Sequence, residues 1–154
     1  MKALDTNVLA RLLLKDDVLQ FKKARALLAS HEYFTAPVTV MLELVWVLES
    51  NDCTPSEIID SLHLLMSLPN FKPAHEHVIR NALTAYLNGL DFADALHLGL
   101  SQKDEALLTF DKSFVKYEKD KGALTNAQLS QIKKTAPKAK GGTIRSSLFG
   151  LENS

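Results

Sequence analysis

The sequence predicts a single α/β domain with a central, mostly parallel sheet flanked by helices. Its 154 residues are the length of one ordinary domain. Short apolar runs alternate with longer segments of helical periodicity, the pattern of parallel strands joined by crossover helices. With 46% hydrophobic and 23% charged residues, 6 Gly and 5 Pro, the composition is that of a globular chain. It excludes disordered and fibrous classes.

The first half of the chain alternates between predicted strands and helices. A short apolar run at residues 2–4 ends in Asp5-Thr6-Asn7, small polar residues typical of a strand-to-helix junction. We expect the following elements in order: a helix from about 8 to 14, a second helix ending near 30, a strand at 33–36 and a helix at 38–49.

The second half of the chain also alternates between predicted helices and strands. Thr54-Pro55-Ser56-Glu57 is a capping box with proline at the first helical position, and it opens a predicted helix at 58–68. The remaining expected elements are a short strand at 70–74, a helix at 78–87 that stops at Asn88-Gly89, a helix at 91–102, a strand at 106–110 and helical turns from Asp111.

Apolar residues become sparse after about residue 126, where lysines gather. We therefore place the domain at residues 1–125 and a basic C-terminal segment, loosely docked or flexible, at residues 126–154. Two interpretations of this segment stay open: an arm that adds contacts to phosphates, or a solubilising tail.

Charge is unevenly divided although the net charge is zero. Residues 1–111 hold 15 acidic and 9 basic residues, and residues 112–154 hold 3 acidic and 9 basic residues. One end could attract a polyanion and the other could attract cations. The single cysteine, Cys53, excludes a disulfide-built scaffold, and no export signal or membrane-length apolar run is visible. We expect a cytoplasmic protein without membrane contact.

Four acids stand out as candidates for a functional site. Ligands of open α/β sheets bind beyond the carboxyl ends of strands, where Asp5 and Asp111 are predicted to lie. Glu43 is the only acid inside an otherwise apolar helix, and Asp94 is flanked by residues that we expect to be buried. Partly buried carboxylates without nearby basic residues favour a cation, and oxygen ligands select Mg²⁺ or Mn²⁺.

Structural roles compete with this interpretation. Asp5 could cap the first helix, and Asp111 could begin a helix. Capping is the better explanation for Asp91, which has Asp94 three residues later in the first turn of the predicted helix. Glu43 has no comparable structural explanation.

Four ordered motifs carry a family resemblance: residues 3–9 (ALDTNVL), 43–48 (ELVWVL), 91–98 (DFADALHL) and 108–114 (LTFDKSF). In this order and spacing the chain resembles the PIN-domain ribonucleases over about residues 1–120. It is most similar to the VapC-type toxins of bacterial toxin–antitoxin pairs. The loop at residues 50–53 is less aromatic than in many relatives, and the basic segment extends beyond the usual end of the domain.

The resemblance implies a metal-dependent endoribonuclease that leaves a 5′-phosphate and a 3′-hydroxyl. It implies four metal-binding acids in the catalytic site: Asp5, Glu43, Asp94 and Asp111. Thr6 and Asn7 would brace these acids by hydrogen bonds. Lys112 and Lys116 are the nearest candidates by sequence for contacts with RNA phosphates.

The resemblance also implies protein partners. VapC-type toxins pair with a small antitoxin that covers the active site. Helices 8–14 and 38–48 offer apolar surfaces for it, although the same residues could lie entirely in the core. A homodimer is implied as well. Two alternatives remain. The chain could be a PIN-fold nuclease of RNA maturation or decay without an antitoxin, or a non-catalytic binding module on the same fold.

Overall fold

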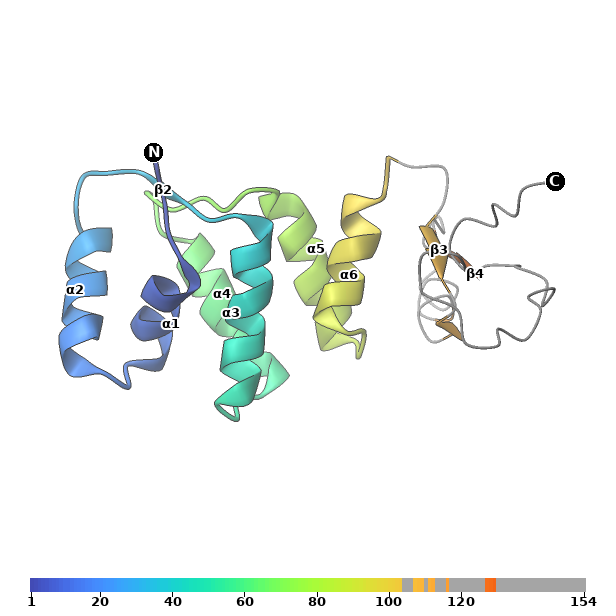
Figure 1. Ribbon diagram of the computed structural model, residues 1–154, viewed down its shortest axis with the longest axis horizontal. Coiled ribbons are helices and arrows are strands. Elements are labelled where there is room, and N and C mark those ends of the chain that lie inside the picture. The colour runs from blue at the N-terminus through green and yellow to red at the C-terminus, as the bar shows by residue number, and fades with distance from the viewer. Residues whose placement is uncertain (104–106, 110, 113–115, 117–126, 130–154) are drawn as a thin grey trace, which may run out of the picture.

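The structure is a computed structural model that describes residues 1–103, 107–109, 111–112, 116 and 127–129 (Figure 1). This part of the chain is mostly helical with short parallel strands. The predicted α/β class is therefore confirmed, with far more helix than sheet.

The first sheet joins the N-terminus to the middle of the chain. β1 (Lys2–Ala3) pairs in parallel with β2 (Phe34–Thr35), with Lys2 opposite Phe34. The predicted strand at residues 70–74 runs along the other side of β2 as a single parallel bridge between Phe34 and Phe71. The N–H of Phe34 donates to the carbonyl of Asn70 at 2.7 Å, and the N–H of Lys72 donates to the carbonyl of Phe34 at 3.0 Å.

The three segments leave this sheet at one edge. The N–H of Leu4 donates to the carbonyl of Thr35 at 2.8 Å, and the N–H of Ala74 donates to the carbonyl of Ala36 at 2.9 Å. Because parallel strands share their direction, Asp5 follows the end of its strand at the edge where α3 also begins. This is the edge at which ligands are expected.

The helices lie close to their predicted ranges: α1 (Thr6–Leu14), α2 (Val18–Leu28), α3 (Val38–Ser50), α4 (Pro55–Met66), α5 (Glu76–Leu87) and α6 (Phe92–Leu100). The capping box of α4 is confirmed. The hydroxyl of Thr54 accepts from the N–H of Glu57 at 3.3 Å, and the Glu57 carboxylate accepts from the N–H of Thr54 at 2.7 Å.

The hydrophobic core lies mainly among the helices and includes Phe34 of β2. Its largest fully buried side chains come from every helix but α2, and from β2: Leu9, Phe34, Met41, Leu44, Val45, Leu48, Ile58, Leu62, Leu65, Ile79, Leu83 and Phe92. α5 and α6 pack so closely at Gly99 that a Cβ atom on this residue would lie 2.6 Å from Cγ1 of Val78. Only glycine fits this contact without a shift of the neighbouring side chain.

A second small sheet follows α6. β3 (Leu107–Thr109) lies inside the predicted strand at 106–110, and it pairs in parallel with β4 (Ala127–Leu129). The described strands are thus parallel, as predicted, but they are divided between two sheets, since β3 pairs with β4 and not with β1. β4 lies beyond the boundary that we placed at residue 125, while residues 130–154 of the basic segment lie outside the described residues.

Candidate active site

A pocket of about 450 Å³ opens at the carboxyl edge of the first sheet. Its lining comes from the junction of β1 with α1 and from one face of α3: Asp5, Thr6, Asn7, Glu43, Trp46, Val47, Ser50 and Asn51. The pocket therefore brings together two of the four predicted acids and both residues predicted to brace them.

Two hydrogen bonds hold these acids. Thr6 is buried, with 7% of its surface exposed, and its hydroxyl donates to Oε2 of Glu43 at 2.6 Å. The amide of Asn7 donates to Oδ2 of Asp5 at 3.4 Å, a long contact. These are the hydrogen bonds that the family resemblance implies. The Thr6 contact also ties the start of α1 to the middle of α3.

Asp5 does not act as a conventional helix cap. It occupies the N-cap position of α1 with an extended backbone, yet its side chain accepts no hydrogen bond from the first turn of the helix. Asp91 differs, because its carboxylate accepts from the N–H of Asp94 at 3.1 Å at the start of α6. The capping interpretation is confirmed for Asp91. The carboxylate of Asp5 instead accepts from the side chain of Asn7.

The expected burial of the acids was wrong for Asp5, Glu43 and Asp111, all of which are exposed. Glu43 lies on a solvent-facing stripe of α3, next to the side chain of Trp46, which is 48% exposed. Because an indole is large and apolar, the sequence pattern places Trp46 in the core, and with it the neighbouring Glu43. The exposed carboxylate has water around it and needs no buried cation.

Asp94 and Asp111 form the second acidic pair. Asp94 is partly buried on α6, and this burial raises the pKa of its carboxyl. The negative charges of Asp91 and Asp111 raise the pKa further, while His97 opposes the shift. Asp111 follows β3, and its backbone N–H donates to the hydroxyl of Thr109 at 3.0 Å. Asp94 and Asp111 are thus close enough to repel each other.

A complete metal site is not assembled by this geometry. Within the part of the chain that the structure describes, no three His, Cys, Asp or Glu side chains are grouped closely enough to hold an ion. The carboxylates are of the type that Mg²⁺ and Mn²⁺ prefer, but they stand as two pairs, Asp5 with Glu43 and Asp94 with Asp111.

Sequence reasoning missed several residues around the first pair. Trp46, Val47 and Ser50 follow Glu43 by three, four and seven residues, so they share its face of α3 and line the same pocket. That spacing is visible in the sequence and could have identified them. The predicted phosphate contacts, Lys112 and Lys116, are exposed and helical but do not line this pocket.

Comparison with known families settles the fold family. The sequence pattern of the PIN domain matches residues 2–120. The chain belongs to the PIN domain family. The match covers β1 to β3 and all four candidate acids, while β4 and the basic segment follow the matched part of the PIN domain.

Comparison with curated proteins finds no relative of this PIN domain. In the portion of the chain with a described structure, no helix combines the length and apolar character that a membrane span requires.

Proposed function

We propose that this PIN domain is a metal-dependent endoribonuclease and the toxin of a toxin–antitoxin pair. The observation that carries the proposal is the pocket in which Asp5 and Glu43 meet at the carboxyl edge of the sheet. There the buried hydroxyl of Thr6 fixes one carboxylate, and the other is not engaged as a helix cap. Membership of a nuclease-like family and the order of the four acids support it.

In the proposed reaction, the carboxylates of Asp5 and Glu43 lie beside the phosphodiester that is cut, and neighbouring side chains hold them in place. Thr6 holds the Glu43 carboxylate in one position, and Asn7 restrains Asp5. A bound Mg²⁺ or Mn²⁺ would supply an acidified water and neutralise charge on the phosphate. Without a cation the acids repel RNA, so metal dependence extends to substrate binding.

The site assignment is tested by removing one charge at a time. We expect Asp5→Asn, Glu43→Gln and Asp94→Asn each to abolish cleavage of single-stranded RNA by the full chain, and Asp111→Asn to weaken it. Asp60→Asn, which neutralises an exposed acid on α4, is the matched control and should retain wild-type cleavage. A folded Asp5→Asn chain, free of contaminating wild type and cutting at the wild-type rate, would refute the assignment.

Metal binding has a test that does not depend on activity. Millimolar Mn²⁺ should raise the melting temperature of the wild-type chain, because it relieves repulsion among the acids and binds the folded state only. The rise should be smaller in the Asp5→Asn and Asp94→Asn chains. A melting temperature that Mn²⁺ leaves unchanged, or full cleavage after dialysis against chelator, would contradict the metal dependence.

The family resemblance is the basis for proposing the toxin role, the antitoxin and the homodimer. The single cysteine is the basis for proposing a cytoplasmic location. Trp46 supports an antitoxin near the active site, because this exposed indole lines the pocket and offers an apolar anchor. A neighbouring antitoxin-sized reading frame would favour a toxin over a nuclease of RNA maturation. Sequencing of RNA ends after brief induction would identify the RNA that is cut.

A further inference from the structure

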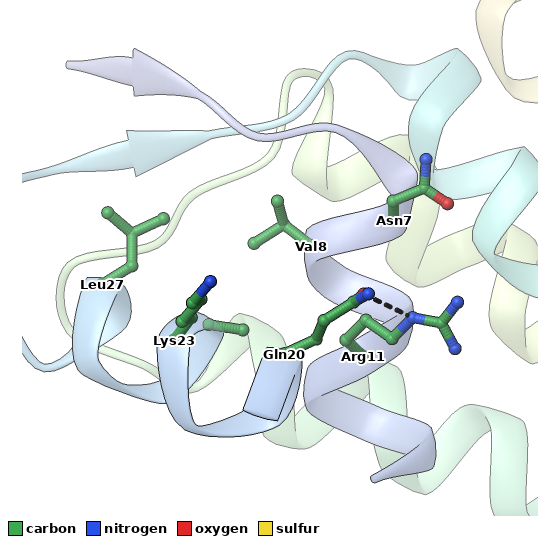
Figure 2. A pocket seen from close by; sticks show the side chains of 7 residues that line it. Asn7, Val8, Arg11, Gln20, Lys23 and Leu27 are labelled. Atoms are coloured by element: carbon green, nitrogen blue, oxygen red, sulfur yellow. Dashed lines mark hydrogen bonds between the residues drawn. The ribbon is translucent and has the colours of Figure 1, made fainter. Parts of the chain in front are cut away.

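A second pocket adjoins the active-site pocket through a shared residue. It has a volume of about 400 Å³ and lies between α1 and α2 (Figure 2). Its lining is Asn7, Val8, Arg11, Gln20, Lys23, Ala24 and Leu27. Asn7 lines both pockets, and the same side chain contacts Asp5. A ligand in the second pocket therefore lies beside the acids of the first.

The walls of this pocket are apolar. Figure 2 shows Val8 on α1 facing the space between the helices, with Leu27 on the opposite helix. Ala24 is almost fully buried and adds to the lining, whereas Leu27 is 37% exposed. A volume of this size falls in the range of about 300–1,000 Å³ that is typical of small-molecule sites.

Two basic and two amide side chains stand at the rim of this mostly apolar pocket. None of the seven lining residues is acidic, and two of them, Arg11 and Lys23, are basic. Arg11 is held by Asp16 and donates through Nε to Oε1 of Gln20 at 2.9 Å. Gln20 thus uses its side-chain carbonyl as an acceptor, and its two amide hydrogens have no partner among the residues that the structure describes. Lys23, exposed on α2, is the cation best placed for a phosphate.

We propose that the pocket between α1 and α2 binds the RNA nucleotide next to the phosphodiester that is cut. The base packs against Val8 and Leu27, Gln20 donates to an acceptor on the base edge, and Lys23 contacts the adjoining phosphate. The combination of an apolar slot, a cationic rim and continuity with the acids fits a nucleotide in a single strand. The proposal rests on the proposed function and assigns a base-selecting site to it.

The test measures binding separately from cleavage. The full chain carrying Asp5→Asn is titrated, in the presence of Mn²⁺, into fluorescently labelled single-stranded octamers of A, C or U. Added Lys23→Gln should weaken binding about fivefold or more, and it should reduce the slope of log affinity against log salt by about 0.7, as expected for one lost contact to a single strand. Leu27→Glu should weaken binding about tenfold or more, and Gln20→Ala should narrow the differences among the three octamers.

Two neighbours on α2 provide matched controls. Lys22→Gln makes the same charge change on an exposed lysine outside the pocket, and Leu19→Glu makes the same apolar-to-acidic change on an exposed leucine. Both should stay within about twofold of the parent affinity. Circular dichroism checks folding, and Lys23→Gln, at an exposed position, serves if Leu27→Glu misfolds.

The outcomes separate this proposal from the proposed function. Losses in Lys23→Gln and Leu27→Glu no larger than in their controls would overturn the nucleotide site. If Lys23→Gln weakens RNA binding but Gln20→Ala leaves the differences among the three octamers unchanged, the base-selecting role is overturned. Failure of the nuclease assignment appears elsewhere, as cleavage that survives Asp5→Asn.

Discussion

The hydrogen bond between Thr6 and Glu43 permits a quantitative test of how the pocket is held. Thr6→Val removes the hydroxyl with little change in shape, and Glu43→Ala removes the acceptor. A hydrogen bond to a charged group contributes about 1.5–3 kcal/mol, and a neutral one about 0.5–1.5 kcal/mol. Because Glu43 is exposed, water replaces the lost donor, so we expect a coupling energy near the lower value, about 1 kcal/mol.

The assay is a double-mutant cycle measured by urea unfolding of the wild type, the two single variants and the double variant. Thr6→Val alone should lower the free energy of unfolding by less than the coupling energy, because the added methyl group is buried and offsets part of the loss. Burial of a full methylene contributes about 0.8 kcal/mol. RNA cleavage should fall at least tenfold in Thr6→Val and be largely retained in Thr6→Ser, which keeps the hydroxyl.

Two results would refute this reasoning. A coupling energy within about 0.3 kcal/mol of zero would mean that the contact does not restrain Glu43, because that is the usual error of additivity. Equal cleavage by the Thr6→Val and wild-type chains would mean that the position of Glu43 does not matter for the reaction.

Four further predictions concern the frame around the site. Gly99→Ala should destabilise the chain by about 1–3 kcal/mol, since its Cβ would overlap Val78, and Val78→Ala should reduce that cost in urea unfolding; equal losses in both backgrounds would contradict the overlap. Thr54→Ala should cost about 1 kcal/mol. Hydrogen bonds from the N–H and hydroxyl of Thr54 hold the pKa of the Glu57 carboxyl below its usual value, so its stabilisation is present above about pH 4.3 and is lost as pH falls further. The stability difference between Glu57→Ala and wild type should therefore shrink in acid, and a difference constant down to pH 2 would oppose this. Asp91→Asn should keep both stability and cleavage, because asparagine also caps α6; a loss equal to that of Asp94→Asn would move the third acid to Asp91.

Local signals explain most of what the sequence predicted correctly. The capping box at Thr54 and the N-cap at Asp91 depend on residues three positions apart, so their hydrogen bonds could be predicted directly. Pairing between strands depends on distant residues. The partner of β3 proved to be β4, in a stretch that looked like a polar tail.

The candidate site divides in the same way. The four acids could be proposed from their order along the chain. The exposure of Glu43 could not be predicted, because its neighbour Trp46 is large and apolar like a core residue but lies on the surface. The pocket between α1 and α2 has no sequence signature. Lys23 and Asn7 share its lining only because the two helices pack side by side.

The parallel register of the first sheet bears on when activity can begin during translation. β1 leaves the ribosome first but has no partner until β2 follows, and α3 must be made before Thr6 can meet Glu43. The lining of the first pocket is complete once residue 51 has been synthesised. Asp94 and Asp111 come much later. If both pairs of acids are needed, as proposed, a nascent chain that contains only the first pair cannot yet cut the RNA around it.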